Sequence, residues 1–441
     1  MQRQRALTDG MIPVFFAFIL IIALPVTAIA FHDGGVARCE GCHTMHNSLG
    51  SKGMITAGGP GDPQASHAYL LKGADAGSTC LNCHATSSPA PDQYHIATYP
   101  APLAGSPPTQ YTPGGDFGWL KKEYTWASSE FMTAESSRGE RHGHNIIAAD
   151  FGFVQDGIQL VSPGGTYSAD KLSCVSCHDP HGRSRIINGT TGAITVPKVG
   201  TTVLPIISSG SYGDLPTATG AVGVYRLLGG KGYYPKSVGN TYAFGFEAFL
   251  AVAPLDYNRS EATSDTRVAY GKDVSLWCAN CHDQIHSAFG GGGHPSGQTL
   301  GPAGYDQNYN VYLKTGSLAG NSSTAFTSMV PFQTDNAVNL TTLKNVAASK
   351  AGPASNDKVM CLTCHRAHAT GWDSSTRWSM SSTFLTVAGA YPGVDAPGEG
   401  SNEDYAMGRT QAEIQATFYG RPASIYATYQ RSLCNKCHVK D

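Results

Sequence analysis

All twelve cysteines of this 441-residue chain lie in six units of the form Cys-x-x-Cys-His, and this pattern constrains the fold more than any other feature. The cysteine pairs are Cys39 and Cys42, Cys80 and Cys83, Cys174 and Cys177, Cys278 and Cys281, Cys361 and Cys364, and Cys434 and Cys437. The histidines that close the units are His43, His84, His178, His282, His365 and His438. No cysteine is left over. Cys-x-x-Cys-His is the attachment signature of c-type haem.

The chemistry of haem attachment accounts for each residue type in the unit. Two thiols add across the two vinyl groups of one haem, and the adjacent histidine becomes the proximal axial ligand of the iron. Structural zinc would use the cysteines in sets of four ligands, and a disulfide scaffold would pair them. Neither requires a histidine after every second cysteine. We therefore predict six covalently bound haem c groups, with the six closing histidines as proximal iron ligands.

The second axial ligand of each iron must come from elsewhere in the chain, and ten further histidines are available: His32, His46, His67, His95, His142, His144, His181, His286, His294 and His368. Three of them, His46, His181 and His368, follow a proximal histidine by three residues. Such a histidine cannot easily reach the far face of its own haem. We expect it to bind the iron of a neighbouring haem, which would hold the haems close together.

The remaining histidines differ in their promise as distal ligands. His95, His144 and His294 lie in loop-like stretches, and a metal bond at His32 would anchor the start of the mature chain. His286 is weaker, because it follows His282 by four residues in an expected helix. His67 and His142 are expected to be ordinary histidines. Methionines do not recur at a fixed offset from the motifs, so bis-histidine, low-potential haems are expected.

Glycine and proline set the fold class. The chain holds 52 Gly and 25 Pro, which interrupt helices and wide sheets, and no sequence repeat accompanies the motifs. We predict a multihaem cytochrome c fold of mostly irregular coil, with short helices, minimal β-structure and the haems forming the core. Helices are expected at residues 275–289, 410–419 and 424–438, and short strands within 186–199. Residues 31–441 should form a single domain.

The first 30 residues resemble a secretory signal peptide. Arg3 and Arg5 precede an apolar run from about Met11 to Val26, and residues 28–30 fit the small-x-small cleavage pattern. A retained membrane anchor is the rival interpretation, because the apolar run is fairly long.

The chain has 30 Lys and Arg against 32 Asp and Glu, so no basic excess indicates a nucleic-acid partner. We expect a protein secreted across the inner membrane, on the outer surface or beyond, with the periplasm as the alternative.

Stretches throughout the chain also match a known family. They include residues 31–48 around the first motif, Thr-Pro-Gly-Gly-Asp-Phe-Gly-Trp at 112–119, and residues 143–146, 177–182, 277–282, 364–369 and 433–438. In these stretches the chain resembles the OmcS-like hexahaem c-type cytochromes, which form extracellular nanowires in metal-reducing bacteria. All six motifs occur in the same order. The long connectors at 191–219 and 316–357 differ most.

The resemblance implies more than the residues alone. Similar proteins stack their haems in one continuous line and assemble head to tail, with the histidine at the position of His46 binding a haem of the neighbouring subunit. By motif order that haem is the one on Cys361 and Cys364. The likeness supports eight distal candidates for six places: His32, His46, His95, His144, His181, His286, His294 and His368.

Three functions can be weighed against these features. The first is a polymeric conduit that carries electrons to extracellular acceptors such as metal oxides and receives them from partner cytochromes. The second is a monomeric periplasmic or surface shuttle with the same haems. The third, a multihaem enzyme, would need an open iron position, yet no attachment motif departs from Cys-x-x-Cys-His and spare histidines are plentiful. We therefore expect an electron-transfer protein and no catalytic residues.

Overall fold

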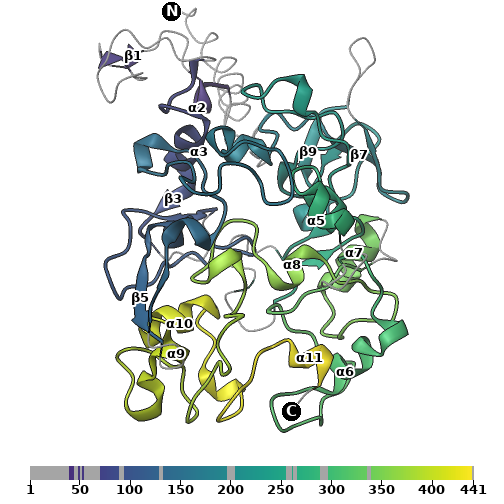
Figure 1. The fold of residues 1–441 in the computed structure, drawn as a ribbon. Helices are drawn as coiled ribbons and strands as arrows, with labels where there is room; N and C mark the ends of the chain where they lie inside the picture. The colour runs from purple at the N-terminus through teal and green to yellow at the C-terminus, as the bar shows by residue number, and fades with distance from the viewer. Residues whose placement is uncertain are drawn as a thin grey trace, which may run out of the picture.

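The computed structural model describes residues 39–43, 48–49, 52–53, 70–88, 94–128, 133–195, 204–254, 261, 266–288, 296–334 and 339–439. Figure 1 shows short helices and strands joined by long irregular connections. Among these residues no helix is long and apolar enough to cross a membrane. The predicted signal peptide, His32, His46, His67 and His294 lie outside the described residues, as does the side chain of His286.

The helices are short, and many of them coincide with attachment motifs. The longest in the described ranges, α3, has nine residues. The α-helices are α2 (Cys39–Cys42), α3 (Ala76–His84), α4 (Val274–Cys278), α5 (Asp283–Ala288), α6 (Tyr305–Val311), α7 (Leu340–Ala347), α8 (Cys361–Cys364), α9 (Glu403–Ala406), α10 (Gln411–Thr417) and α11 (Asn435–His438). Turns of 3-10 helix lie between them, and one of these, Cys174–Ser176, begins the third motif.

The strands are shorter still. They are β1 (Ser48–Leu49), β2 (Lys52–Gly53), β3 (Ala85–Thr86), β4 (Ala97–Thr98), β5 (Tyr124–Ala127), β6 (Ala134–Ser137), β7 (Arg185–Asn188), β8 (Ala193–Thr195), β9 (Ile206–Ser209), β10 (Ala221–Gly223), β11 (Ala251–Val252) and β12 (Ala269–Tyr270). Four of them form one sheet in the order β8-β7-β10-β9, with β10 antiparallel to β7 and parallel to β9. The other eight pair two by two. The predicted coil-rich fold with minimal β-structure is confirmed.

Two of the expected elements are confirmed at their positions. Helix α10 begins after Thr410, whose side chain and Glu413 form a capping box. The chain leaves this region through Gly420, which has a φ of 72°. Strands β7 and β8 lie within the expected range 186–199, apart from the first residue of β7.

Two helix predictions need correction. The expected helix at 275–289 is divided into α4 and α5, because the second half of the attachment motif lies between them. The expected helix at 424–438 is wrong over most of its length, and only α11 and the end of a 3-10 turn at Ala423–Ile425 are helical. Gln430 explains the difference. Its side chain is fully buried and donates to Tyr312 Oη at 2.9 Å, and its backbone N–H donates to Thr386 Oγ1 at 2.9 Å. These contacts favour an extended segment over a helix.

The chain contributes three apolar clusters of its own. The first surrounds β10, β11, β12 and α7, the second lies between α6 and α10, and the third packs α3 against β4 and β5. Fully buried members include Val222 and Leu340 in the first, Tyr309 and Phe418 in the second, and Leu81 and Ala148 in the third. Between the second and third clusters lies a buried ion pair, Lys122 Nζ to Glu413 Oε1 at 2.6 Å. These clusters hold the connections that position the attachment motifs.

Candidate haem attachment sites

Each attachment motif forms a single helical turn of the same kind. In five motifs the backbone N–H of the closing histidine donates to the carbonyl of the first cysteine: His43 to Cys39 at 2.8 Å, His178 to Cys174 at 3.0 Å, His282 to Cys278 at 3.1 Å, His365 to Cys361 at 3.0 Å and His438 to Cys434 at 3.1 Å. In the remaining motif the same turn is the end of α3. Residues three apart in such a turn share a face, so each cysteine pair can reach one haem. All twelve thiols are free.

The six motifs lie in one file that follows the order of the sequence. In every pair of consecutive motifs, a thiol of one motif lies close enough to a thiol of the next to influence its pKa. The pairs are Cys42 with Cys80 and Cys83, Cys80 with Cys174, Cys177 with Cys281, Cys278 with Cys361, and Cys364 with Cys434. Burial together with the nearby Cys281 raises the pKa of Cys177 to about 12. In Figure 1, α2 and α3 lie toward the upper end, α8 near the middle and α11 at the lower end. The sequence did not predict this spatial order.

Four of the closing histidines, which are the predicted proximal ligands, have the same hydrogen bond on the ring nitrogen nearer the backbone. Nδ1 faces a carbonyl oxygen in each: His84 with Tyr94 at 2.6 Å, His178 with Arg226 at 2.8 Å, His282 with Pro163 at 2.8 Å and His365 with Ser374 at 2.8 Å. A carbonyl oxygen can only accept, so Nδ1 must carry the proton in these rings. The lone pair is then on Nε2, which is the arrangement that a metal-binding histidine needs.

Backbone turns with positive φ hold the proximal histidines of the first, third and fifth motifs. These histidines form isolated β-bridges: His43 with Leu71, His178 with Leu228 and His365 with Thr376. The residues just before each bridge partner are left-handed without being glycine: Leu70 at 52°, Arg226 and Leu227 at 47° and 54°, and Ser374 and Ser375 at 58° and 56°. Left-handed backbone costs about 1–2 kcal/mol at such residues. The same three motifs have the additional histidine three residues further on.

Sequence reasoning missed these turn residues. A glycine at such a position would have been a signal, but arginine, leucine and serine are not associated with left-handed backbone. The bonds that hold the fifth turn are visible only in the structure. Arg366 N–H donates to Ser375 O at 2.8 Å, and Ser375 Oγ donates to Arg366 O at 2.8 Å. The carbonyl of Ser374 is thereby fixed beside His365.

Three pairs of imidazoles bring a proximal histidine against a distal candidate. The ring centroids of His43 and His181 lie 6.4 Å apart, those of His178 and His368 6.5 Å, and those of His144 and His282 6.1 Å. An imidazole nitrogen lies about 2 Å from a bound first-row metal, so two rings on opposite sides of one metal have centroids roughly 6 Å apart. The rings of His43 and His181 are almost parallel, at 10°. The residues therefore fit an iron between two axial histidines.

Burial keeps two of the distal candidates neutral. Burial together with the nearby His282 lowers the pKa of His144 to about 4, and burial together with the nearby His178 lowers the pKa of His368 to about 3. The Nδ1 atom of His144 faces the carbonyl of Ala367 at 2.7 Å, as in the proximal histidines. A neutral imidazole is the form that binds a metal ion.

His95 has a different setting from the three paired candidates. It directly follows Tyr94, whose carbonyl accepts from His84, and its ring centroid lies 5.4 Å from that of Tyr94. The rings of His181, His368 and His144 lie against those of His43, His178 and His282. For His95 the role of distal ligand stays a prediction.

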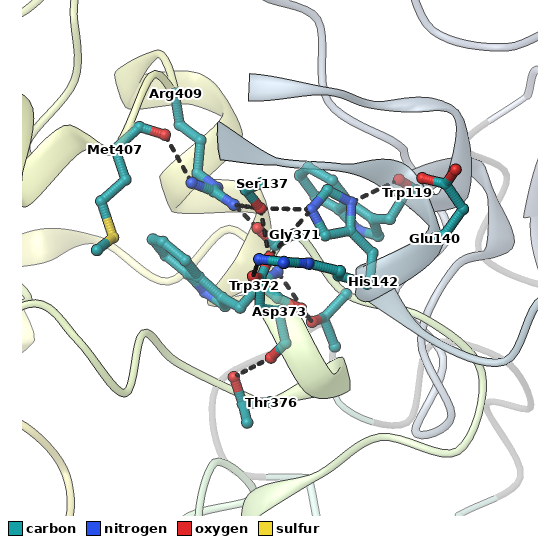
Figure 2. Close-up of polar contacts among 12 residues, drawn as sticks. Trp119, Ser137, Glu140, His142, Gly371, Trp372, Asp373, Thr376, Met407 and Arg409 are labelled. Atoms are coloured by element: carbon teal, nitrogen blue, oxygen red, sulfur yellow. Dashed lines mark hydrogen bonds and ion pairs between the residues drawn. The ribbon is translucent and has the colours of Figure 1, made fainter. Parts of the chain in front are cut away.

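His142 is occupied on both ring nitrogens, as expected of an ordinary histidine. It is fully buried, its Nδ1 faces the carbonyl of Trp119 at 2.8 Å, and its Nε2 faces Ser137 Oγ at 2.9 Å. Figure 2 shows this network, in which Arg409 Nη2 also donates to Ser137 Oγ at 2.9 Å and Ser137 donates to Asp373. The ring has no nitrogen left for a metal. The network instead fixes the position of Asp373. The next residue, Ser374, has the carbonyl that faces His365 Nδ1.

Comparison with known proteins identifies the family. No family model matches the chain. It is 47% identical to the C-type cytochrome OmcS of Geobacter sulfurreducens over 96% of both chains. Its structure matches the cryo-EM structure of the OmcS nanowires with a TM-score of 0.81 at 47% identity, covering 93% of this chain and all of that chain. A second structure, the Outer Membrane Cytochrome S filament of the same organism, matches with a TM-score of 0.80 at 45% identity over the same shares. The chain therefore belongs to the OmcS family of c-type cytochromes, which carry electrons on covalently bound haem c and are not enzymes.

Proposed function

We propose that the chain is an extracellular electron conduit with six haem c groups, and that it polymerises head to tail. The single file of attachment motifs is the observation that carries this proposal. The twelve cysteines would hold the six groups, and the closing histidines would be the proximal ligands. When bound, haem c supplies reversible one-electron chemistry. Because every motif interacts with the next one in the sequence, the file has no gap at which electron transfer would have to stop.

The distal ligands follow a regular step along the file. His181 belongs to the third motif and faces His43 of the first, and His368 belongs to the fifth motif and faces His178 of the third. In both cases the histidine that lies three residues after a closing histidine is assigned to the haem of the motif two places earlier in the sequence. His144, from the connection before the third motif, is assigned to the haem of His282.

The same step supports the head-to-tail contact. Beyond the fifth motif no further motif of this kind remains in the chain, so the haem of His365 has no histidine two motifs ahead. The first motif of a second copy would supply one. Its His46 occupies the position that His181 and His368 occupy in their motifs. We propose that His46 binds the haem on Cys361 and Cys364 of the neighbouring subunit, which makes the contact heterologous and open-ended.

Two haems then remain for the other distal candidates. These are the haems of His84 and His438, and the candidates are His32, His95, His286 and His294. Two of these four would serve as ligands and two would be spare. The haem-free histidines of this group are expected to keep ordinary hydrogen-bonding roles.

Export and assembly are supported by the relatives. OmcS forms filaments, and 93% of this chain covers the whole of the OmcS chain in both filament structures. In length this share matches residues 31–441, which would remain after removal of the first 30 residues as a signal peptide. We propose one haem-containing domain over residues 31–441, with partner cytochromes as electron donors and extracellular solids such as metal oxides as acceptors.

Native secreted material tests this function against the monomeric shuttle. Electron microscopy and size-exclusion chromatography should show filaments, and the conductance of single filaments should be measurable along their length. Intact mass should show six haem groups on each chain. Haem-loaded single chains in the periplasm, with no polymer at any concentration, would favour the shuttle.

Neighbouring histidines give a sharp test of the axial ligands. Replacing His144 by alanine should remove one axial ligand and convert one haem of the six from low-spin to high-spin, as seen by electron paramagnetic resonance. His142→Gln is the matched control, because it changes a buried histidine two residues away that has no free nitrogen. It should cost about 1–3 kcal/mol of stability through lost hydrogen bonds and leave all haems low-spin. A high-spin signal in the control, or none in His144→Ala, would overturn the assignment.

A further inference from the structure

A cluster of buried charges lies against the fifth attachment motif. Glu261 Oε2 accepts from Arg366 Nη1 at 2.8 Å and from Arg377 Nη1 at 3.1 Å, and none of the three side chains is more than 1% exposed. A third cation, Arg421, is also buried and acts on the same carboxylate. Burial alone would raise the pKa of Glu261, but Arg377 and Arg366 outweigh it and hold that pKa below its usual value. The glutamate is therefore ionised.

The charges in this cluster do not balance. Three guanidinium groups meet one carboxylate, and arginine cannot lose its proton in a protein. Arg366 Nε and Arg377 Nη2 are buried donors without an acceptor among the described residues. The guanidinium of Arg366 also lies over the ring of Tyr419, 3.8 Å from its centroid, an arrangement suited to an uncompensated cation. Counted over the described side chains, the cluster thus carries a net positive charge, in a region with little solvent to screen it.

Arg366 and Arg377 both lie directly against the fifth attachment motif. Arg366 directly follows His365 in the sequence. Arg377 Nε donates to Leu362 O at 2.8 Å, and its backbone N–H donates to Cys364 O at 2.8 Å. These two bonds place the charge of Arg377 against the backbone of the motif that would hold the haem.

We infer that the cluster of Glu261, Arg366, Arg377 and Arg421 raises the reduction potential of the haem on Cys361 and Cys364. A fixed positive charge disfavours the oxidised, more positive iron and favours the reduced one. The negative charge of Glu261 opposes that of the arginines and so reduces the rise in potential. The inference rests on the proposed function, in which this haem receives its distal ligand from the next subunit. A raised potential would keep the haem at each subunit junction reduced for longer than the other haems of the filament.

Potentiometric titration of the haem-loaded protein, followed by its absorption spectrum, tests the inference. Glu261→Gln removes the anion and should raise the potential of one haem component. Arg377→Met removes a cation and should lower the potential of one component. The charge-preserving changes Glu261→Asp and Arg377→Lys should leave the titration close to that of the unmodified protein, although they disturb the same packing.

Glu413→Gln is the matched control for breaking a buried ion pair elsewhere. Its partner is Lys122, and its other hydrogen bonds go to Tyr124 and Thr410. It should lower stability without moving any potential. Shifts of the same sign in Glu261→Gln and Arg377→Met, equal shifts in Glu413→Gln, or no shift in correctly loaded protein would overturn the inference.

A measurement on the unmodified protein decides the matter if the variants fail to load haem. Haem methyl signals in nuclear magnetic resonance can be followed as the protein is reduced stepwise. The signals of the haem on Cys361 and Cys364 should be among the first to change, and their appearance among the last would overturn the inference. Each variant is compared with the unmodified protein in the same state of assembly, because a single chain would lack the His46 of a neighbouring subunit at this haem. The sign of each shift is expected to be the same in single chains and in filaments, so a failure to polymerise would affect the proposed function and leave this comparison intact.

Discussion

A chain in which Cys278 and Cys281 are both replaced by alanine is expected to carry five haem groups and to lose electron transfer along its length. These thiols occupy the middle of the file, where Cys281 neighbours Cys177 and Cys278 neighbours Cys361. In the proposed file, electrons pass from each motif to the next, so a missing haem in the middle would separate the two halves. Intact mass should give the haem number, and conductance of any filaments that form should fall to the background.

The control for this change alters the same helix without removing a haem. Trp277 directly precedes Cys278 in α4, and its Nε1 donates to Gly229 O at 2.7 Å. Trp277→Phe should cost about 1 kcal/mol for the lost hydrogen bond and keep six haem groups and normal conductance. If the five-haem chain conducts as well as the unmodified protein, the motifs do not form a single path for electrons.

The spacing of cysteine and histidine is enough to predict the attachment sites from the sequence alone, because a covalent haem would fix both the residue types and their separation. The helix at 410–419, with Gly420 as its stop, was predictable in the same way, and the structure adds that Thr410 and Glu413 form a capping box at its start. The order of the motifs in space was not predictable. It depends on contacts between segments with no periodic pattern, and the Glu261 bonds to Arg366 and Arg377, for example, span 105 and 116 residues.

The candidate distal ligands were likewise only partly predictable from the sequence. Sequence and resemblance left eight histidines for six places, because any loop histidine can be a ligand if the fold carries it to an iron. The structure brings His144, His181 and His368 against proximal rings. It also gives His142 two hydrogen-bond partners, one of them the carbonyl of Trp119. The turn residues Arg226 and Ser374 carry no sequence signal at all, since their backbone is held left-handed by tertiary contacts.

Replacing His46 by alanine is expected to leave each chain folded with six haem groups and to abolish long filaments. The substituted copy can no longer complete the haem beside His365 of its neighbour, so one haem per chain should become high-spin. Even about 1.4 kcal/mol lost at each contact weakens association tenfold, and the effect recurs at every junction. Filament length in electron micrographs and the high-spin signal should change together. His67→Ala, a histidine of the same region with no assigned haem, should change neither. Filaments of normal length in His46→Ala would mean that protein contacts alone hold the polymer and that the haem of His365 obtains its distal ligand within its own chain.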